Sequence, residues 1–329
     1  MEASYIKLLK SGELKRRVET AKKMLENCTL CPRGCRVNRL AGELGFCGSH
    51  SSVVISSYGL HYGEEPPVSG QMGSGTIFFT GCNLRCLFCQ NYQISQEYEG
   101  REITIQKLAQ AMLDLESQGA HNINLVSPSH FVPQILEALL IASEKGLKLP
   151  IVYNTNGYDT VETLKLLDGI VDIYLPDIKY SDDRYAKSYS GAGDYVKHNR
   201  AALKEMYRQV GNLSMDAGGA AERGVIIRHL VLPVRPDHPG GPAGGAGSLE
   251  SLDFIKNELS ADAFVSLMSQ YHPCYKAKEH PILNRRLKHT EYDEVVQYAE
   301  KLGLKNCYIQ ALVSSDDFLP DFNKEKPFD

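Results

Sequence analysis

Apolar and polar positions alternate along the chain with two different periods. Short apolar runs are typical of buried strands, and apolar residues at three- and four-residue steps are typical of amphipathic helices. Strand-like runs occur at residues 75–81, 122–128, 149–157, 171–180, 224–233, 263–273 and 306–312. Helical periodicity occurs at residues 104–119, 131–146, 160–169, 193–211, 248–259 and 290–303. Strands that alternate with helices predict parallel pairing and right-handed crossovers.

The residues at the strand ends distinguish a barrel from an open doubly wound sheet. Cysteines follow the first predicted strand, and the other strand ends carry Ser127, Asn154, Asp177 and His272. A full or partial barrel collects its strand ends at one mouth. We therefore predict an α/β fold, a partial (β/α)6 TIM-like barrel with one further short strand at the end.

The first 50 residues precede this rhythm and predict a cysteine-rich N-terminal appendage. Apolar residues at helical spacing between Ile6 and Leu25 predict one helix. Residues 28–48 are rich in Gly and Cys and indicate a loop around a metal. The predicted division is thus residues 1–50, with the helix and a four-cysteine metal site, and residues 51–329, with the barrel. Within the barrel, the Gly/Pro-rich residues 235–247 predict a mobile loop.

Composition and charge exclude several classes of protein. The chain has 329 residues, 43% of them hydrophobic, which is enough for a sizeable core. Its net charge of −4 gives no signal for nucleic acid or a membrane surface. The N-terminal residues lack the apolar region of a secretory signal, and no apolar run is long enough to cross a bilayer. We therefore expect a soluble, cytoplasmic protein, in which closely spaced cysteines favour metal binding over disulfides.

Cys82, Cys86 and Cys89 form a C-x3-C-x2-C group directly after the first predicted barrel strand. Three thiolates can hold a [4Fe–4S] cluster at three of its irons and leave the fourth iron open to another ligand. The alternative is a zinc loop completed by His50 or His61. Zinc sites usually pair their cysteines as two C-x2-C groups, which favours the cluster.

This spacing, with Phe88 before the last cysteine, resembles the hallmark of the radical S-adenosylmethionine (SAM) superfamily. The resemblance implies that SAM binds the open iron through its amino and carboxylate groups. It implies that one electron from the cluster cleaves SAM to methionine and a 5′-deoxyadenosyl radical, which abstracts a hydrogen atom. It also implies an electron donor such as flavodoxin or ferredoxin, and it assigns Phe88 to the cofactor site.

Residues 75–310 also resemble proteins related to the pyruvate formate-lyase activating enzyme. The "DIK" at residues 177–179 stands at the end of a strand, as in those activases. The resemblance implies that Lys179 pairs with an anionic group of SAM and that Asp177 lies at SAM or at a cation site. It further implies that Arg228, in an apolar strand, and His272, in "YHP", contact SAM.

Two positions depart from the pattern of these relatives. Residues 126–130 read "VSPSH" where many superfamily members carry a "GGE" that holds the SAM amino group. Ser127 or the backbone would then make that contact. In the "TNG" strand, which helps to form a monovalent-cation site in the activases, Asn154 replaces an aspartate. A cation site here would therefore lose one charge.

The resemblance implies an activase-like oxidoreductase that could install a glycyl radical on a partner protein. One alternative is a radical SAM enzyme that acts on a small molecule or a peptide. Another is a non-catalytic iron–sulfur electron-transfer or metal-binding module. SAM distinguishes these classes, because an electron carrier would neither bind nor cleave it.

A second cysteine group lies in the N-terminal part, with the spacing C-x2-C-x3-C-x11-C. Its members are Cys28, Cys31, Cys35 and Cys47. Four thiolates close a tetrahedral site, so we expect a structural zinc ion or an auxiliary iron–sulfur cluster. The sequence does not decide between them, and unliganded thiols remain the third alternative.

Overall fold

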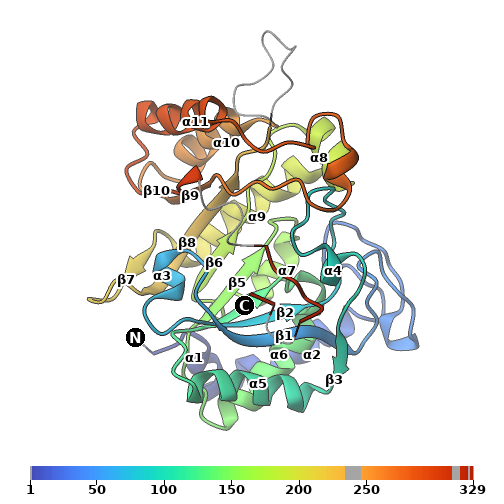
Figure 1. Cartoon of the computed structure of the whole chain (residues 1–329). Coiled ribbons are helices and arrows are strands. Elements are labelled where there is room, and N and C mark those ends of the chain that lie inside the picture. Colours follow the sequence, from blue (N-terminus) through green and yellow to red (C-terminus); the bar gives the residue numbers. More distant parts are fainter. Residues whose placement is uncertain (1, 234–245, 313–318, 325–326, 329) are drawn as a thin grey trace.

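The computed structural model describes residues 2–233, 246–312, 319–324 and 327–328 (Figure 1). Its strands form one sheet with the order β10-β9-β8-β6-β5-β4-β2-β1-β3, and β7 pairs with β8. The strands are β1 (Val53–His61), β2 (Ser74–Phe79), β3 (Arg101–Ile103), β4 (Ile123–Val126), β5 (Ile151–Thr155), β6 (Ile173–Pro176), β7 (Ser214–Met215), β8 (Ala221–Leu230), β9 (Phe264–Met268) and β10 (Cys307–Ile309).

The central part of the sheet is parallel and follows the order of the chain. Neighbouring strands pair in parallel along the series β2, β4, β5, β6, β8, β9 and β10. A doubly wound sheet reverses its strand order at a switch point, whereas a barrel keeps chain order. Among the described residues, the sheet ends at β10 on one side and at β1 and β3 on the other, so this part of the chain forms an open barrel. The predicted partial TIM-like barrel is confirmed.

Helices follow the parallel strands, as the hydrophobic periodicity predicts. Figure 1 shows α1, α2, α5 and α6 together at one end of the molecule and α10 and α11 at the other. The α-helices are α1 (Tyr5–Lys10), α2 (Glu13–Lys23), α3 (Pro66–Ser69), α4 (Tyr92–Ser95), α5 (Ile105–Ser117), α6 (Val132–Glu144), α7 (Val161–Leu166), α8 (Asp183–Ser190), α9 (Tyr195–Val210), α10 (Ser248–Phe254) and α11 (His289–Leu302). A π-helical turn, Ile255–Leu259, extends α10.

Side-chain caps fix the beginnings of α5 and α7. Thr104 Oγ1 accepts a hydrogen bond from the Lys107 N–H at 3.2 Å at the start of α5. Thr160 Oγ1 accepts one from the Thr163 N–H at 3.4 Å at the start of α7. Such caps satisfy amide groups that have no partner inside the helix. They agree with the predicted starts of α5 and α7, which lie within one residue of the observed ones.

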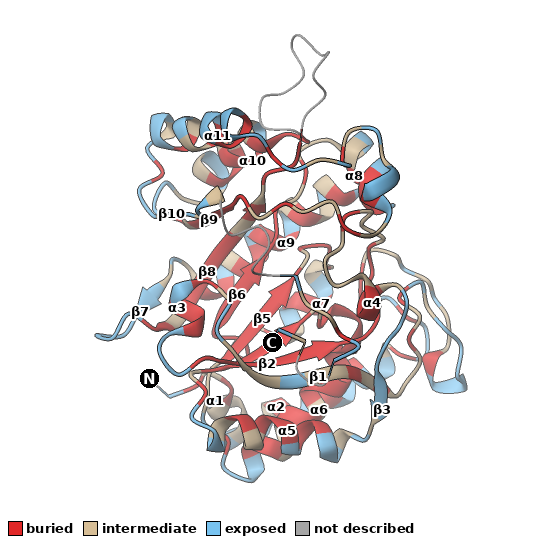
Figure 2. Ribbon diagram, in the orientation of Figure 1, coloured by how far each residue is buried: buried red, intermediate tan, exposed pale blue. Residues whose placement is uncertain are grey.

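The apolar residues form two layers of core around the sheet (Figure 2). The larger core lies between the sheet and the helices and includes Leu125 and Ile227. A smaller cluster on the other side of the strands joins Val68 of α3 to Val152 and Leu175. Helix α3 therefore packs against strands on the inner side of the partial barrel. The segment between β1 and α3 carries two acidic residues that matter below.

The predicted N-terminal helix is broken into α1 and α2. Gly12 separates them with a φ of 77°, a left-handed conformation that ends the helical hydrogen bonding. Both helices join the main core: Leu14 and Val18 are buried there, and the Tyr5 hydroxyl donates to the Leu147 carbonyl at 3.0 Å. The four-cysteine loop instead packs in a small cluster of its own with Leu25. The division at residue 50 stays a prediction.

Other elements were not expected from the sequence. The antiparallel strands β1 and β3 lie outside the predicted βα units, and α8 lies between the strand predicted at 171–180 and the helix predicted at 193–211. In β1 only the first residues alternate between buried and partly buried, which weakens its strand signal. Residues 234–245, which hold most of the predicted mobile loop, lie outside the described residues. None of the helices among the described residues has the length and apolar character that a membrane crossing requires.

Candidate functional site

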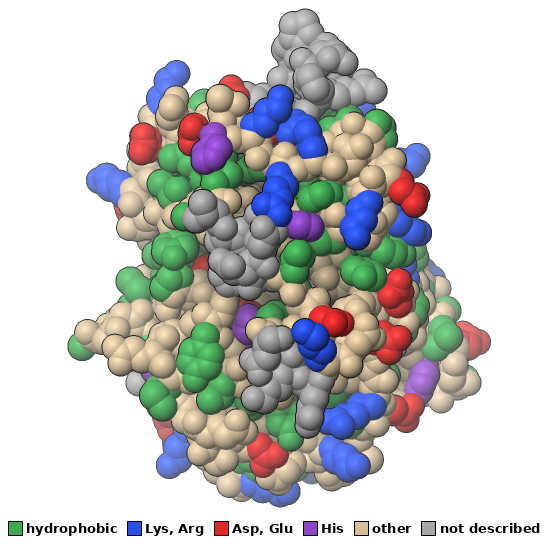
Figure 3. Space-filling view, in the orientation of Figure 1, with side chains coloured by type: hydrophobic (Ala, Val, Ile, Leu, Met, Phe, Trp, Pro, Cys, Tyr) green, Lys and Arg blue, Asp and Glu red, His purple; other side chains and the backbone are tan. Residues whose placement is uncertain are grey.

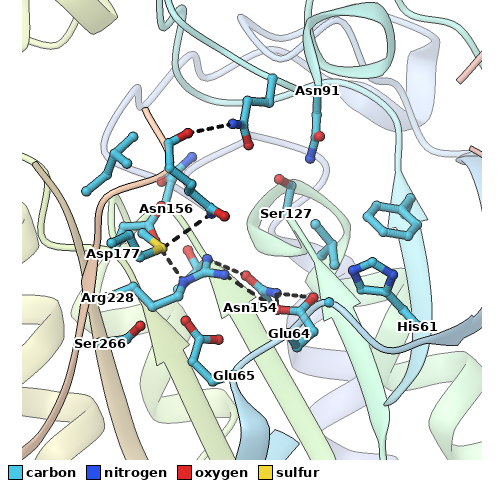
Figure 4. A pocket seen from close by; sticks show the side chains of 18 of the residues that line it. His61, Glu64, Glu65, Asn91, Ser127, Asn154, Asn156, Asp177, Arg228 and Ser266 are labelled. Atoms are coloured by element: carbon cyan, nitrogen blue, oxygen red, sulfur yellow. Dashed lines mark hydrogen bonds and ion pairs between the residues drawn. The ribbon is translucent and has the colours of Figure 1, made fainter. Parts of the chain in front are cut away.

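A cavity of about 810 Å3 opens at the carboxyl ends of the parallel strands (Figure 4). Residues from the ends of β2, β4, β5, β6, β8, β9 and β10 line it. The lining includes these predicted site residues: Cys82, Cys86, Phe88, Cys89, Ser127, Asn154, Asp177, Lys179 and Arg228. The strand ends therefore meet at one mouth, and a cavity of this size is typical of a cofactor or substrate site.

The three-cysteine loop is held in place by backbone hydrogen bonds from other loops of the mouth. The Leu87 N–H donates to the Tyr189 carbonyl at 2.8 Å, and the Ala277 N–H donates to the Leu87 carbonyl at 2.9 Å. From the β5 side, the Asn83 side-chain amide donates to the Tyr158 carbonyl at 2.7 Å. The loop is therefore tied to several neighbouring segments of the mouth.

The thiols of this loop are partly buried and receive hydrogen bonds. Asn156 Nδ2 donates to Cys82 Sγ at 3.3 Å, and Ser190 Oγ donates to Cys86 Sγ at 2.9 Å. Burial raises the pKa of Cys82 to about 11 and that of Cys89 to about 12. Thiols with such pKa values stay protonated near neutral pH unless a metal binds them, whereas the donors beside them suit sulfur that carries negative charge.

The residues present fit an iron–sulfur cluster. Three thiols line one cavity, and polar donors contact two of the sulfurs. Among the described residues, no three His, Cys, Asp or Glu side chains already have the geometry of a closed metal site. The fit therefore depends on the soft donor set and its position at the mouth, which is the chemistry that clusters require.

Asp177 lies between two cations at the end of β6. Its Oδ2 is 2.6 Å from Lys179 Nζ, and its Oδ1 accepts from Arg228 Nε at 2.9 Å. The three side chains are only 12%, 15% and 16% exposed, so this is not a solvated surface pair. Burial alone would raise the pKa of Asp177, but Arg228 and Lys179 hold it below the ordinary value. Likewise, burial would lower the pKa of Lys179, but Asp177 and Cys86 raise it.

Asn154 connects this group to a glutamate that the sequence analysis missed. Arg228 Nη2 donates to Asn154 Oδ1 at 2.6 Å, and Asn154 Nδ2 donates to Glu64 Oε1 at 3.2 Å. Asn124 Nδ2 also donates to Glu64 Oε1, at 2.9 Å. Both polar atoms of the Asn154 amide are therefore engaged within the protein.

Glu64 and Glu65 lie at one end of the cavity, in the segment between β1 and α3 (Figure 4). Burial raises the pKa of both carboxyls, and Arg228 opposes that rise. His61 lines the same end, and burial lowers its pKa to about 4, so its ring is neutral. In the sequence these residues precede the βα rhythm and match no motif. Two adjacent acids after a partly buried strand were the only signal.

The remaining predicted cofactor residues differ in whether they line the cavity. Ser127 lines the cavity with a φ of 57°, and its N–H donates to the Asn154 carbonyl at 2.9 Å. Phe88 is buried and packs against Tyr271, with the ring centroids 5.9 Å apart. His272 is not among the residues that line the cavity, although Gln270 is. The contact of His272 with SAM stays a prediction.

The four N-terminal cysteines lie outside the cavity lining, in the loop after α2. A Cβ added to Gly45 would be 3.5 Å from Cys47 Sγ and 3.7 Å from Cys35 Sγ, so two of the sulfurs flank this glycine. Burial raises the pKa of Cys31, and the nearby thiols Cys47, Cys28 and Cys35 raise it further. The group is thus gathered in space.

The four-cysteine loop also contacts the three-cysteine loop. Arg33 Nε donates to the Asn83 carbonyl at 2.8 Å, and its guanidinium stacks on Phe46 at 3.8 Å. Arg85 of the three-cysteine loop also lies over the Phe46 ring, at 4.4 Å. One arginine from each cysteine loop thus lies over the ring of Phe46. On the face shown in Figure 3, acidic and basic side chains both occur across the surface.

Comparisons with known proteins place the chain in a family. Residues 76–218 match the model of the radical SAM superfamily. An uncharacterized protein of Methanocaldococcus jannaschii is 34% identical over 312 residues, which cover 92% of this chain and 83% of that protein. The pyruvate formate-lyase-activating enzyme of Clostridium pasteurianum is 26% identical over 170 residues, which cover 49% of this chain and 63% of that enzyme.

A crystal structure of Streptococcus suis SuiB bound to the precursor peptide SuiA is similar with a TM-score of 0.47 and 13% identity. The match covers 73% of this chain and 49% of that one. The match to the family model carries the assignment, and the M. jannaschii relative shows similarity over nearly the whole chain. The chain belongs to the radical SAM superfamily, a superfamily of enzymes whose cofactors are a [4Fe–4S] cluster and SAM.

Proposed function

We propose that this protein cleaves SAM reductively at a [4Fe–4S] cluster held by Cys82, Cys86 and Cys89. The observation that carries the proposal is the position of the three thiols in one cavity with the Lys179–Asp177–Arg228 group. When bound, the reduced cluster supplies one electron to SAM, which yields methionine and a 5′-deoxyadenosyl radical for hydrogen abstraction. The protein itself binds and orients the cofactor and excludes water from the cavity.

Individual residues have separate tasks in this proposal. Asn156 and Ser190 donate hydrogen bonds to cysteine sulfurs and so stabilise their negative charge. Lys179 pairs with the carboxylate of SAM, and Asp177 keeps the lysine charged and in position. Ser127 presents backbone groups at the end of β4, where its φ of 57° turns the chain. Phe88 forms an apolar part of the cavity wall beside the cysteines.

The proposal is tested by anaerobic cluster reconstitution, followed by dithionite and SAM. We expect 5′-deoxyadenosine to form in protein with a full cluster. The triple variant Cys82→Ala, Cys86→Ala, Cys89→Ala is expected to form none. Cys307→Ala is the matched control, because it removes a thiol that does not line the cavity. No 5′-deoxyadenosine from fully loaded protein would refute the proposal and favour an electron-transfer module.

For the substrate class, we propose an activase-like oxidoreductase that acts on a protein or a peptide. The similarity to the C. pasteurianum enzyme, whose name states that it activates another enzyme, supports this proposal. The alternative is a small-molecule substrate. Stimulation of 5′-deoxyadenosine formation by the macromolecular fraction of a cell extract, lost on protease treatment, would support a protein substrate. Stimulation by the small-molecule fraction alone would contradict it.

The proposal also requires an electron donor and reduced thiols. A flavodoxin or ferredoxin would supply the electron in place of dithionite, and the expected measurement is 5′-deoxyadenosine formed with such a donor and its reductase. All nine cysteines are free, which agrees with a reducing compartment such as the cytoplasm.

For the four N-terminal cysteines, we propose a closed structural site that holds zinc or an auxiliary iron–sulfur cluster. Their gathering in one loop, away from the cavity lining, supports a role separate from SAM cleavage. Metal analysis of the triple Cys82, Cys86 and Cys89 variant tests this directly. Zinc, or iron with sulfide, is expected to remain. Neither metal in that variant would show that the group is not a metal site.

A further inference from the structure

One carboxylate oxygen of an acidic residue at one end of the cavity has no hydrogen-bond partner in the described part of the protein. Glu65 is 8% exposed, and its Oε2 has no hydrogen-bond partner among the described residues. Gln310 Oε1 is a second buried atom of this kind that lines the same cavity. Both atoms are acceptors. A buried acceptor without a partner is unfavourable by about 1–3 kcal/mol. A hydrogen-bond donor on a bound molecule would therefore stabilise either site.

This end of the cavity is distinct from the end that faces the cysteines. Figure 4 shows Glu64 and Glu65 at the opposite end of the pocket from Asn91 and Asn156. Asn156 donates to Cys82 Sγ, so it marks the cysteine end. A molecule bound at Glu65 would therefore lie beyond the cofactor position, where a substrate is needed.

The charges around Glu65 also lack one positive partner. The carboxylates are Glu64, Glu65 and Asp177, and the cations that contact them are Arg228 and Lys179. Three negative charges against two positive charges leave a deficit of one when all are ionised. Buried charge is unfavourable unless it is paired, so a ligand with a single positive charge would complete the group.

The hydrogen bonding indicates an organic cation. Glu64 is already engaged by the amides of Asn124 and Asn154, so Glu65 has the free oxygen of the pair. Hard metal ions such as Ca²⁺ and Mg²⁺ need about six or more oxygen ligands, and the described residues include no such group of acids and histidines. An N–H donor needs only one acceptor per bond.

We propose that Glu65 binds a primary alkylammonium group of the substrate, at the end of the cavity opposite the cysteines. The proposal rests on the proposed function and names the chemistry of its substrate. Glu65 accepts a charge-assisted hydrogen bond from the ammonium. A lysine side chain of a protein or peptide has this group, as does a free amine.

The test compares n-butylammonium chloride with n-butanol, a neutral molecule of similar size. Cluster-loaded protein with SAM is titrated anaerobically with each probe in a calorimeter. We expect saturable binding of n-butylammonium and at least about tenfold weaker binding of n-butanol, since hydrogen bonds to charged groups are the stronger ones. This comparison uses the unsubstituted protein, so it does not depend on whether a variant folds.

The variant Glu65→Gln keeps the size of the side chain and removes its charge. It is expected to weaken n-butylammonium binding by about tenfold or more and to leave n-butanol unchanged. Glu279→Gln is the matched control, because Glu279 is an exposed acid away from the cavity lining. It is expected to bind n-butylammonium as the unsubstituted protein does.

Other results would overturn the proposal. Equal binding of the two probes, or full n-butylammonium affinity in Glu65→Gln, would show that Glu65 does not select an ammonium. If KCl competes fully with n-butylammonium at equal concentration, the position belongs to an inorganic cation. If Glu65→Gln instead weakens SAM binding, Glu65 holds the cofactor. Failure of the proposed function would be seen separately, as no 5′-deoxyadenosine from the unsubstituted protein.

Discussion

Both cysteine groups of this protein offer thiolates as metal ligands, but only one of the two groups lines the cavity. Cys82, Cys86 and Cys89 line a cavity of about 810 Å3 with charged residues around it. The N-terminal cysteines do not line that cavity, and three of the four are buried. Three thiols beside open space leave a place for another ligand, whereas four thiols gathered in a loop can satisfy a metal by themselves. The number of cysteines and their access to the cavity together distinguish a catalytic from a structural site.

The contact between the two loops adds to this comparison. Arg33 from one loop and Arg85 from the other stack on Phe46 at 3.8 and 4.4 Å. Loss of order in the N-terminal loop would therefore remove contacts from the loop that carries the catalytic cysteines. The predictions below test whether the two groups can be separated in function.

The largest expected effect is on SAM cleavage. Replacing Cys82, Cys86 and Cys89 with alanine should reduce 5′-deoxyadenosine formation to background and remove about four irons per chain, one cubane. Replacing the N-terminal cysteines should leave that cubane in the protein. Iron and sulfide analysis with product chromatography checks both. Loss of all iron and of all 5′-deoxyadenosine formation in both variants would contradict two separate sites.

The next effect is on stability. Cys31→Ala in the N-terminal group should lower the midpoint of thermal unfolding by about 5 °C or more, because metal binding contributes to folding free energy. Cys307→Ala, which removes a partly buried thiol elsewhere, is the control. Anaerobic differential scanning fluorimetry with zinc and iron analysis provides the measurement. If Cys31→Ala and Cys307→Ala have the same midpoint and metal content, the N-terminal thiols are unliganded.

A smaller effect is expected from Lys179→Ala. The variant should weaken SAM binding by about tenfold while cluster content stays the same, because Lys179 would contact the cofactor carboxylate and not the iron. Equilibrium binding of SAM to protein matched for iron content measures this. Lys187→Ala, on α8, is the control. A fall in iron content that accounts for the loss of SAM binding would show that Lys179 supports the cluster loop instead.

The smallest effect is expected from Ser127→Ala. Its N–H is engaged with the Asn154 carbonyl and its φ is positive, so the backbone conformation defines this strand end. SAM affinity should therefore change by less than about threefold. A loss of about 1 kcal/mol or more, the size of one hydrogen bond, would show that the hydroxyl itself binds the cofactor.

The sequence predicts the parallel strands well because their apolar runs end in polar residues. It predicts that Cys82, Asp177 and Arg228 share one mouth, and the cavity lining agrees. It does not predict β1, whose burial alternates only over its first residues. One helix was expected where Gly12 separates two, because a left-handed glycine leaves the apolar spacing unchanged on both sides.

The acidic end of the cavity is the part of the site that the sequence does not reveal. Glu64 and Glu65 precede the βα rhythm, and only the packing of α3 against the inner strands brings them to Arg228. Their spacing matches no ligand motif. Their importance depends on burial and on hydrogen-bond partners, which are properties of the folded chain.

The most direct test of the account is the electron paramagnetic resonance spectrum of the dithionite-reduced protein with and without SAM. An open iron at the three-cysteine site predicts that SAM changes the spectrum, because it adds ligands to that iron. The change should persist when the N-terminal cysteines are replaced and should be absent from the Cys82, Cys86 and Cys89 triple variant. A spectrum that SAM leaves unchanged, in protein with a full cluster, would contradict the central claim.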